Sequence, residues 1–136
     1  MIEREREIID RYLGIPYKHL GRNSEEGLDC WGLIKCVYRD LKFDVWDPVK
    51  QYSPNLRNGE NHLIENYHKE WYEIVSPHIF DVVLFNNSRG VANHAGIVLS
   101  LWCFLHCGRS GVIISKLSDR KWIERKVGFY RLKQNV

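Results

Sequence analysis

The segment Gly-Leu-Asp-Cys-Trp-Gly-Leu-Ile at residues 27–34 predicts the end of a loop, a helix cap and the first turns of a buried helix. Asp29 is a good N-cap, because its side-chain oxygen accepts a backbone N–H of the first turn. Apolar residues then recur at helical spacing on one face, at Cys30, Leu33, Ile34, Val37, Tyr38 and Leu41. The chain must therefore supply a surface that covers this face.

Cys30 lies at the N-terminal end of that face, where a helix carries partial positive charge and unpaired N–H groups. Both favour a thiolate, so this is a suitable place for a nucleophilic cysteine, and the same N–H groups can hold a developing oxyanion. The alternative is that Cys30 is a small buried residue, which is the commonest fate of a free cysteine.

Length and composition indicate a single globular domain over residues 1–136, since 44% of the residues are hydrophobic and 27% are charged. No apolar run approaches the ~20 residues of a membrane span. Met1–Glu7 lacks the apolar core of a signal peptide. We therefore expect cytoplasmic synthesis, a mature fragment, or a chain that leaves by another route such as a phage particle. The net charge of +3 is mild, and without a dense Lys/Arg stripe we expect no nucleic-acid partner.

The four cysteines are expected to be free thiols, because no secretory signal is seen and Cys30 and Cys36 point to different sides of one helix. Cys103, His106 and Cys107 suggest zinc ligands, but strand alternation places His106 opposite the two cysteines. We therefore predict no metal site.

The order of the elements predicts an α+β fold, with helices first and an antiparallel meander after them. We expect a helix over Glu3–Tyr12, with Ile8, Ile9, Tyr12 and Leu13 on its buried face, and the Cys30 helix up to Lys42. Residues 43–60 are predicted to be irregular and residues 61–74 to be helical. The strands are expected at residues 81–85, 94–99, 101–107, 112–114 and 127–132, with a turn or short helix at 118–124.

Two histidines on neighbouring strands favour the catalytic interpretation of Cys30. Alternation puts His94 and Gly96 on one face of their strand, and Phe104 and His106 on one face of the next. In a hairpin, both histidines can lie on the sheet face that packs against the Cys30 helix. His94 would then take the proton of Cys30, and His106 would fix the tautomer of His94. Gly96 would leave room beside His94 for a substrate or the helix end. Taken alone, a histidine at either position is more often a partly buried or surface residue with no catalytic role.

These residues resemble the NlpC-type cell-wall endopeptidases, a branch of the papain-like cysteine peptidases. The resemblance extends over about residues 10–132 and depends on the order and spacing of several short motifs. They are Ile15-Pro16-Tyr17, the polar loop Gly21–Gly27, Asp29-Cys30-Trp31-Gly32-Leu33, Asp81–Phe85, His94–Val98 and Leu105-His106.

The resemblance implies a papain-like fold in which the nucleophile helix packs on a central antiparallel sheet. It implies that Cys30 is the nucleophile, His94 the base and His106 the residue that orients it. Tyr17, with Asp29 and Trp31 beside the nucleophile, would form the substrate-binding or oxyanion group. The implied reaction hydrolyses amides in peptidoglycan stem peptides through an acyl-enzyme, without a metal or organic cofactor.

Two departures bear on the subgroup. Trp31 replaces the usual serine, and together with Gly128-Phe129-Tyr130-Arg131 it resembles the phage-tail and prophage members of the family. Phe80 stands where the family has glycine, which is expected to alter a turn. The subgroup implies phage tail proteins as partners and action at the cell wall from a virion.

Two alternatives stay open. One is a non-catalytic tail assembly or tip protein that makes contacts through aromatic side chains, with Trp46, Tyr52, Tyr72 and Trp102 as candidates. The other is a thiol hydrolase that acts on a different amide or ester. Residues 43–60 are expected to wall the pocket that decides between substrates.

Overall fold

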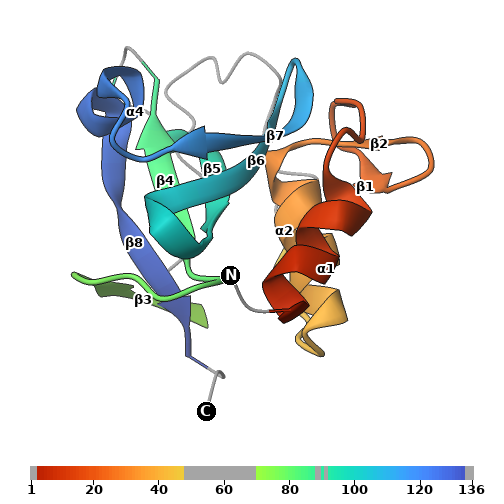
Figure 1. Cartoon of the computed structure of the whole chain (residues 1–136), viewed down its shortest axis with the longest axis horizontal. Helices are drawn as coiled ribbons and strands as arrows, with labels where there is room; N and C mark the ends of the chain where they lie inside the picture. Colours follow the sequence, from red (N-terminus) through yellow and green to blue (C-terminus); the bar gives the residue numbers. More distant parts are fainter. Residues whose placement is uncertain (1–2, 48–69, 88–89, 91, 134–136) are drawn as a thin grey trace.

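The computed structural model describes residues 3–47, 70–87, 90 and 92–133, and it has the predicted α+β architecture (Figure 1). Two helices, α1 (Glu3–Tyr12) and α2 (Cys30–Asp40), lie together on one side of the sheet. The short helix α4 (Arg120–Arg125) lies far from them. No helix in the described ranges combines the length and the apolar character that crossing a bilayer requires.

The main sheet has six antiparallel strands in the order β3-β8-β4-β5-β6-β7. Their bounds are β3 Trp71–Ile74, β4 Val82–Asn86, β5 Ala92–Val98, β6 Cys103–Gly108, β7 Gly111–Lys116 and β8 Lys126–Leu132. Strands β4 to β7 form the predicted meander, whereas β8 inserts between β3 and β4. A separate two-stranded ribbon, β1 (Arg22–Asn23) with β2 (Gly27–Leu28), forms within the loop that precedes α2.

Helix α2 begins where the sequence predicts, because the Asp29 carboxylate accepts the backbone N–H of Gly32 at 2.8 Å. The predicted apolar face is buried, and so are Trp31, Gly32 and Cys36 on other sides of the helix. This wider burial arises because α2 packs on β5 and β6 on one side and on the β1–β2 ribbon on another. At Gly32 the ribbon loop is so close that a Cβ would lie 1.9 Å from the Gly21 carbonyl oxygen.

Helix α1 has the predicted bounds but a different buried face. Ile8, Ile9 and Tyr12 are buried as expected, whereas Leu13 is 50% exposed. Glu5, expected on the polar face, is fully buried, because its carboxylate accepts the backbone N–H and the hydroxyl of Ser100. A buried carboxylate is tolerated when it has such partners.

Two predicted elements differ from the structure. The helix predicted over residues 61–74 is wrong at its end, where Trp71–Ile74 form the edge strand β3, paired with β8. Trp71 is buried because it packs edge-on against Trp31 and Tyr38. The strand predicted at residue 101 begins at Cys103, since residues 100–102 form the 3-10 turn η2 (Ser100–Trp102). The rest of the predicted helix, and the irregular segment from residue 48 with Tyr52, lie outside the described residues.

The sheet has a separate apolar cluster on each face. The helix face packs α1 and α2 onto residues such as Val82, Ala95 and Leu105. The opposite face carries a smaller, mainly aromatic cluster closed by Trp122 of α4, which consists of Val83, Phe85, Val98, Phe104, Leu117, Trp122 and Phe129.

Candidate active site

Cys30 is the first residue of α2 and is partly exposed. Strands β5 and β6 pair only from Gly96 opposite His106 to Val98 opposite Phe104, so the start of β5 is open toward β6. The thiol lies at this opening, where the backbone of Ala95 is within hydrogen-bonding reach. The amides of Cys30 and Trp31 precede the first intrahelical hydrogen bond and are therefore available to an oxyanion.

The Cys30 thiol is protonated at neutral pH, contrary to the expectation that the helix end favours a thiolate. Burial above all, and then the Asp29 carboxylate, raise the pKa of Cys30 to about 12. The Ala95 backbone and Arg22 lower this pKa but do not offset the burial. Desolvation of a charged thiolate is thus the main cause of the raised pKa.

Asp29 has a structural role, and its place in the substrate or oxyanion group stays a prediction. Besides capping α2, its carboxylate accepts the backbone N–H of Leu20 at 3.1 Å and binds Arg22 at 2.7 Å. Arg22 also holds Asp47 with two hydrogen bonds of 2.9 and 3.0 Å. The carboxylate is buried, and a carboxylate offers no donor to an oxyanion. This network fixes the loop against the nucleophile end of α2.

Trp31 is likewise a core residue, and its place in the substrate or oxyanion group stays a prediction. It is 3% exposed, and its indole N–H donates to the carbonyl of Trp46 at 2.9 Å. Tyr17, by contrast, is 39% exposed. Burial raises the pKa of Tyr17, and so do the nearby Asp29 and Cys30. Of the three residues, only Tyr17 has an exposed side chain.

The two histidines are in direct contact, as their proposed roles require. Nε2 of His94 lies 2.7 Å from Nδ1 of His106. Nε2 of His106 in turn lies 2.8 Å from Oγ of Ser115, on β7. The result is a continuous line of three polar side chains from β5 through β6 to β7.

The histidines lie on the sheet face opposite α2, which corrects the prediction that they face the Cys30 helix. The ring of His94 stacks on Trp122, with the centroids 5.6 Å apart, and that of His106 stacks on Phe104 at 4.4 Å. The residue between Gly96 and His94, Ala95, is the one that faces α2. The space beside Gly96 is filled by Phe104 and is not open to substrate, since a Cβ at Gly96 would lie 2.7 Å from that ring.

Both histidines are neutral at neutral pH. Burial lowers the pKa of His94 to about 3, with further lowering by His106, Arg125 and Lys121. Burial and Lys121 lower the pKa of His106 to about 4. Among the described residues, no hydrogen bond joins Cys30 to His94, and the only His94 ring nitrogen with a partner is Nε2. Nδ1 of His94 is therefore the nitrogen left for a proton from the thiol.

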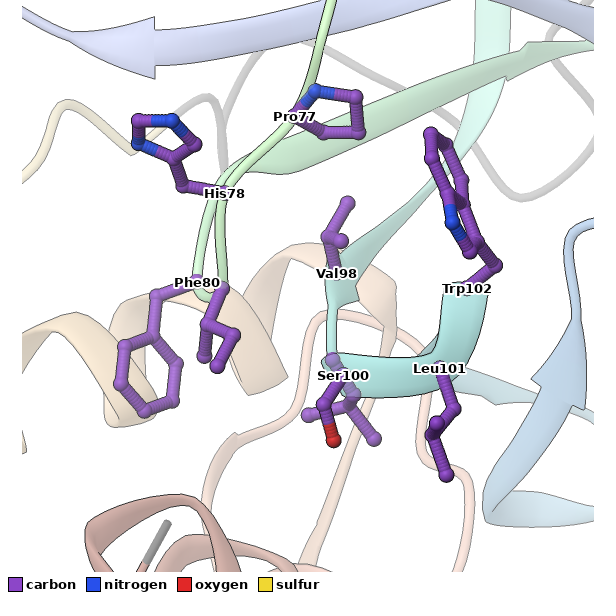
Figure 2. A pocket seen from close by; sticks show the side chains of 9 residues that line it. Pro77, His78, Phe80, Val98, Ser100, Leu101 and Trp102 are labelled. Carbon is purple, nitrogen blue, oxygen red and sulfur yellow. The ribbon is translucent and has the colours of Figure 1, made fainter. Parts of the chain in front are cut away.

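A cavity of about 600 Å³ lies at the other end of β5, away from Cys30 and the histidines (Figure 2). Its apolar walls come from the segment before β4 and from the β5–β6 connection: Pro77, His78, Ile79, Phe80, Val98, Leu99, Ser100, Leu101 and Trp102. Phe80 has a φ of 76°, which explains why the resembling family has glycine here. Phe80 thus adopts at this cavity the backbone conformation that favours glycine, and whether it alters the turn stays a prediction.

Sequence reasoning missed Ser115 and Arg22, and did not connect Trp122 with the histidines. The contact of Ser115 with His106 could have been predicted from the tight turn between Gly108 and Gly111. That turn sets the register of β6 with β7, in which Phe104 pairs with Ser115 and His106 with Ile113. Ser115 is then the diagonal neighbour of His106 on the same face. Nothing in the sequence pattern indicates that Arg22 would bind Asp29, because the two residues lie in different parts of an irregular loop.

Comparison with known proteins covers nearly the whole chain. The profile of the NlpC/P60 family matches residues 14–131. Murein DD-endopeptidase MepH of Escherichia coli is 31% identical over 123 residues, which cover 88% of this chain and 42% of that protein. Two Bacillus subtilis proteins, probable peptidoglycan endopeptidase LytE and gamma-DL-glutamyl hydrolase, are 30% and 31% identical over 88% and 90% of this chain. The match covers 31% and 27% of those two, so the chain spans less than half of each relative.

Solved structures share the fold. An NLP/P60-family protein of Staphylococcus aureus, described as similar to a lipoprotein, superposes with a TM-score of 0.71 at 23% identity. That match covers 97% of this chain and 42% of the other. The NlpC/p60 domain of the peptidoglycan hydrolase SagA superposes with a TM-score of 0.57 at 20% identity, over 93% of both chains.

Proposed function

The chain belongs to the NlpC/P60 family, and from this premise we propose that it is a cysteine hydrolase of amide bonds in peptidoglycan stem peptides. The observation that carries the proposal is the contact of His94 with His106 on strands beside the helix that opens with Cys30. Two of the relatives are named as cell-wall endopeptidases, which favours this substrate class.

In the proposed reaction, Cys30 is the nucleophile and His94 the general base. Since thiol and imidazole are both neutral at rest, the proton moves to Nδ1 of His94 as Sγ attacks the carbonyl carbon. The oxygen becomes an anion, and the amides at the start of α2 and the Tyr17 hydroxyl are its candidate donors. The imidazolium is half-buried, and its Nε2–H donates to Nδ1 of His106.

The leaving amine takes the proton back from His94, and the C–N bond breaks to leave a thioester on Cys30. Water then attacks the thioester carbonyl and gives a proton to His94. The C–S bond breaks, the thiol regains its proton, and the acid product is released. The steps need no metal, cofactor or oxidant.

The test is digestion of purified peptidoglycan by the wild type and by Cys30→Ala, with the released fragments identified by mass spectrometry. We expect fragments that need a free thiol and disappear in the variant, whose fold should persist because the change is small. Cleavage by Cys30→Ala would refute the nucleophile assignment. A wild type that cleaves no wall preparation would refute the peptidoglycan substrate.

A different amide is the second candidate, favoured by the 31% identity to a gamma-DL-glutamyl hydrolase. The same assay with poly-γ-glutamate as substrate separates the two. A non-catalytic binding protein is the third candidate: Tyr72 and Trp102 are 44% and 61% exposed, as contacts with a partner require. Labelling of Cys30 by a thiol-reactive substrate analogue, but not of Cys36, would exclude this third candidate.

We also propose that the chain acts at the cell wall as part of a phage tail. The support is the resemblance of Asp29-Cys30-Trp31-Gly32-Leu33 to the tail-associated members. Mass spectrometry of purified virions after induction of the source strain is the test. Absence of the chain from particles that contain the other tail proteins would refute this assignment.

A further inference from the structure

We propose that Ser115 is a positioning residue for the reaction, because its Oγ accepts the proton on Nε2 of His106 and thereby sets the tautomers of both histidines. The contact is 2.8 Å, on a side chain outside the Cys-His-His set. This inference rests on the proposed function for its catalytic consequence, but the tautomers themselves are a property of the free protein.

A neutral imidazole has one donor nitrogen and one acceptor nitrogen. For Nδ1 of His94 to accept the thiol proton, the hydrogen of His94 must be on Nε2. That N–H then donates to Nδ1 of His106, across the 2.7 Å contact. His106 must accordingly carry its own hydrogen on Nε2, and the partner of that N–H is Ser115.

The opposite direction disables the base. If the Ser115 hydroxyl donated to Nε2 of His106, then His106 would donate from Nδ1 to His94. His94 would then carry its hydrogen on Nδ1 and could not accept a proton there. The direction of the hydrogen bond at Ser115 therefore decides whether Nδ1 of His94 is free to act as a base.

The location of Ser115 suits an acceptor. His106 is 3% exposed, so water is a poor substitute partner for its Nε2–H. Ser115 itself is partly exposed, so its own hydrogen can be donated to solvent while Oγ accepts from His106. The register of β6 with β7 fixes this geometry, since Ser115 pairs with Phe104, two residues before His106.

The test compares Ser115→Ala and Ser115→Thr, with Ser118→Ala as the control at an exposed position of the same segment. Nitrogen-15 NMR of labelled histidines in the free protein reports the tautomers directly. In the wild type, Ser115→Thr and Ser118→Ala, we expect hydrogen on Nε2 of both His94 and His106. In Ser115→Ala we expect a large fraction with hydrogen on Nδ1.

The kinetic counterpart is a fall in kcat of about 10-fold to 100-fold in Ser115→Ala, a part of what a general base contributes, with KM unchanged and Thr restoring the rate. Hydrogen on Nδ1 of His94 in the wild type, or unchanged tautomers in Ser115→Ala, would overturn the proposal. Because NMR needs no substrate, a protein that cleaves no peptidoglycan would refute the proposed function without affecting this result.

Discussion

The two faces of the six-stranded sheet bury different kinds of group. The helix face covers thiols: Cys107 donates to the carbonyl of Leu28, and Cys30 lies where α2 meets β5. The opposite face covers imidazoles, with His94 and His106 packed among Phe104 and Trp122. Burial raises the pKa of the thiols and lowers the pKa of the imidazoles, so both faces hold their groups neutral.

The difference shows that the proposed nucleophile and the proposed base are positioned by different parts of the fold. The helix face supplies a nucleophile whose position depends on one capped helix end, which local sequence determines. The histidine face supplies a base whose position depends on the register of three strands and on the cover by α4. Tight backbone packing at the capped helix end should therefore make the fold most sensitive to changes there, whereas changes among the histidines should mainly affect the base.

The largest expected effect is a loss of folding in Gly32→Ala. The added Cβ would lie 1.9 Å from the Gly21 carbonyl oxygen, which is backbone and cannot swing away. We expect a fall of more than about 4 kcal/mol in the free energy of unfolding, measured by denaturant titration. Gly96→Ala is the matched change on the histidine side, where the nearest atom belongs to the Phe104 ring. It should cost about 1–3 kcal/mol, and a larger loss than Gly32→Ala would reverse the comparison.

The second prediction separates the two histidines by activity. His94→Ala should lower kcat/KM by about 10²–10⁴-fold, because a general base contributes that much. His106→Ala should lower it less, by at least the 10-fold to 100-fold expected for Ser115→Ala, since His106 orients the base and does not itself take the thiol proton. Both variants should keep most of their stability, which circular dichroism can check. Equal losses of activity would mean that the pair acts as one unit or that the roles are exchanged.

The third prediction concerns the pH dependence of stability. Stability should fall on the acid limb because of the histidine face and on the alkaline limb because of the thiols of the helix face. The pKa values of His94 and His106 are lowered from 6.5 to about 3 and 4 by folding. Below pH 6.5 the unfolded chain therefore binds more protons than the folded protein. The contribution of the two histidines to the free energy of unfolding is therefore fully present above pH 6.5 and is lost as the pH decreases toward 4. The pKa values of Cys30 and Cys107 are raised to about 12 from 9.0, so stability should fall again between pH 9 and 12.

Denaturation midpoints measured across the pH range check this, with one variant for each limb. His106→Gln should flatten the acid limb, and Cys107→Ser the alkaline one. If His106→Gln changed the alkaline limb instead, the assignment of limbs to faces would be wrong.

The smallest expected effect is a change in histidine titration in Trp122→Phe. The smaller ring covers His94 less completely and admits water, so the pKa of His94 should rise from about 3 toward its ordinary 6.5. NMR titration of the ring protons measures it. Trp31→Phe, on the helix face, should leave the histidine titration unchanged. A shift in Trp31→Phe as large as that in Trp122→Phe would show that the two faces are not independent.

The sequence predicted best what depends on neighbouring residues. The start of α2 was correct because the cap at Asp29 and the helical spacing after Cys30 are local signals. The strands from Val82 onward were correct apart from residues 101 and 102, because their period of two is also local. The family resemblance is confirmed by the match over residues 14–131.

Features that depend on tertiary packing were missed or wrong. Helical spacing alone placed Trp71 in a helix, although its partner is the distant strand β8. Alternation correctly put His94 and His106 on one face, but the choice of face depended on where α2 and Trp122 dock. The protonated state of Cys30 follows from burial, which the helix pattern does not reveal. The catalytic roles of Cys30, His94 and His106 stay predictions until the variants are measured.

The central place of β8 in the sheet has a consequence for synthesis on the ribosome. Strands β3 and β4 are separated by a short segment of chain, yet β8, from residues 126–132, lies between them. Until those residues leave the exit tunnel, β4 has an open edge and β3 has no partner. The sheet therefore cannot be completed until β8 has left the tunnel. Until then the histidine face also lacks Phe129, which belongs to its apolar cluster.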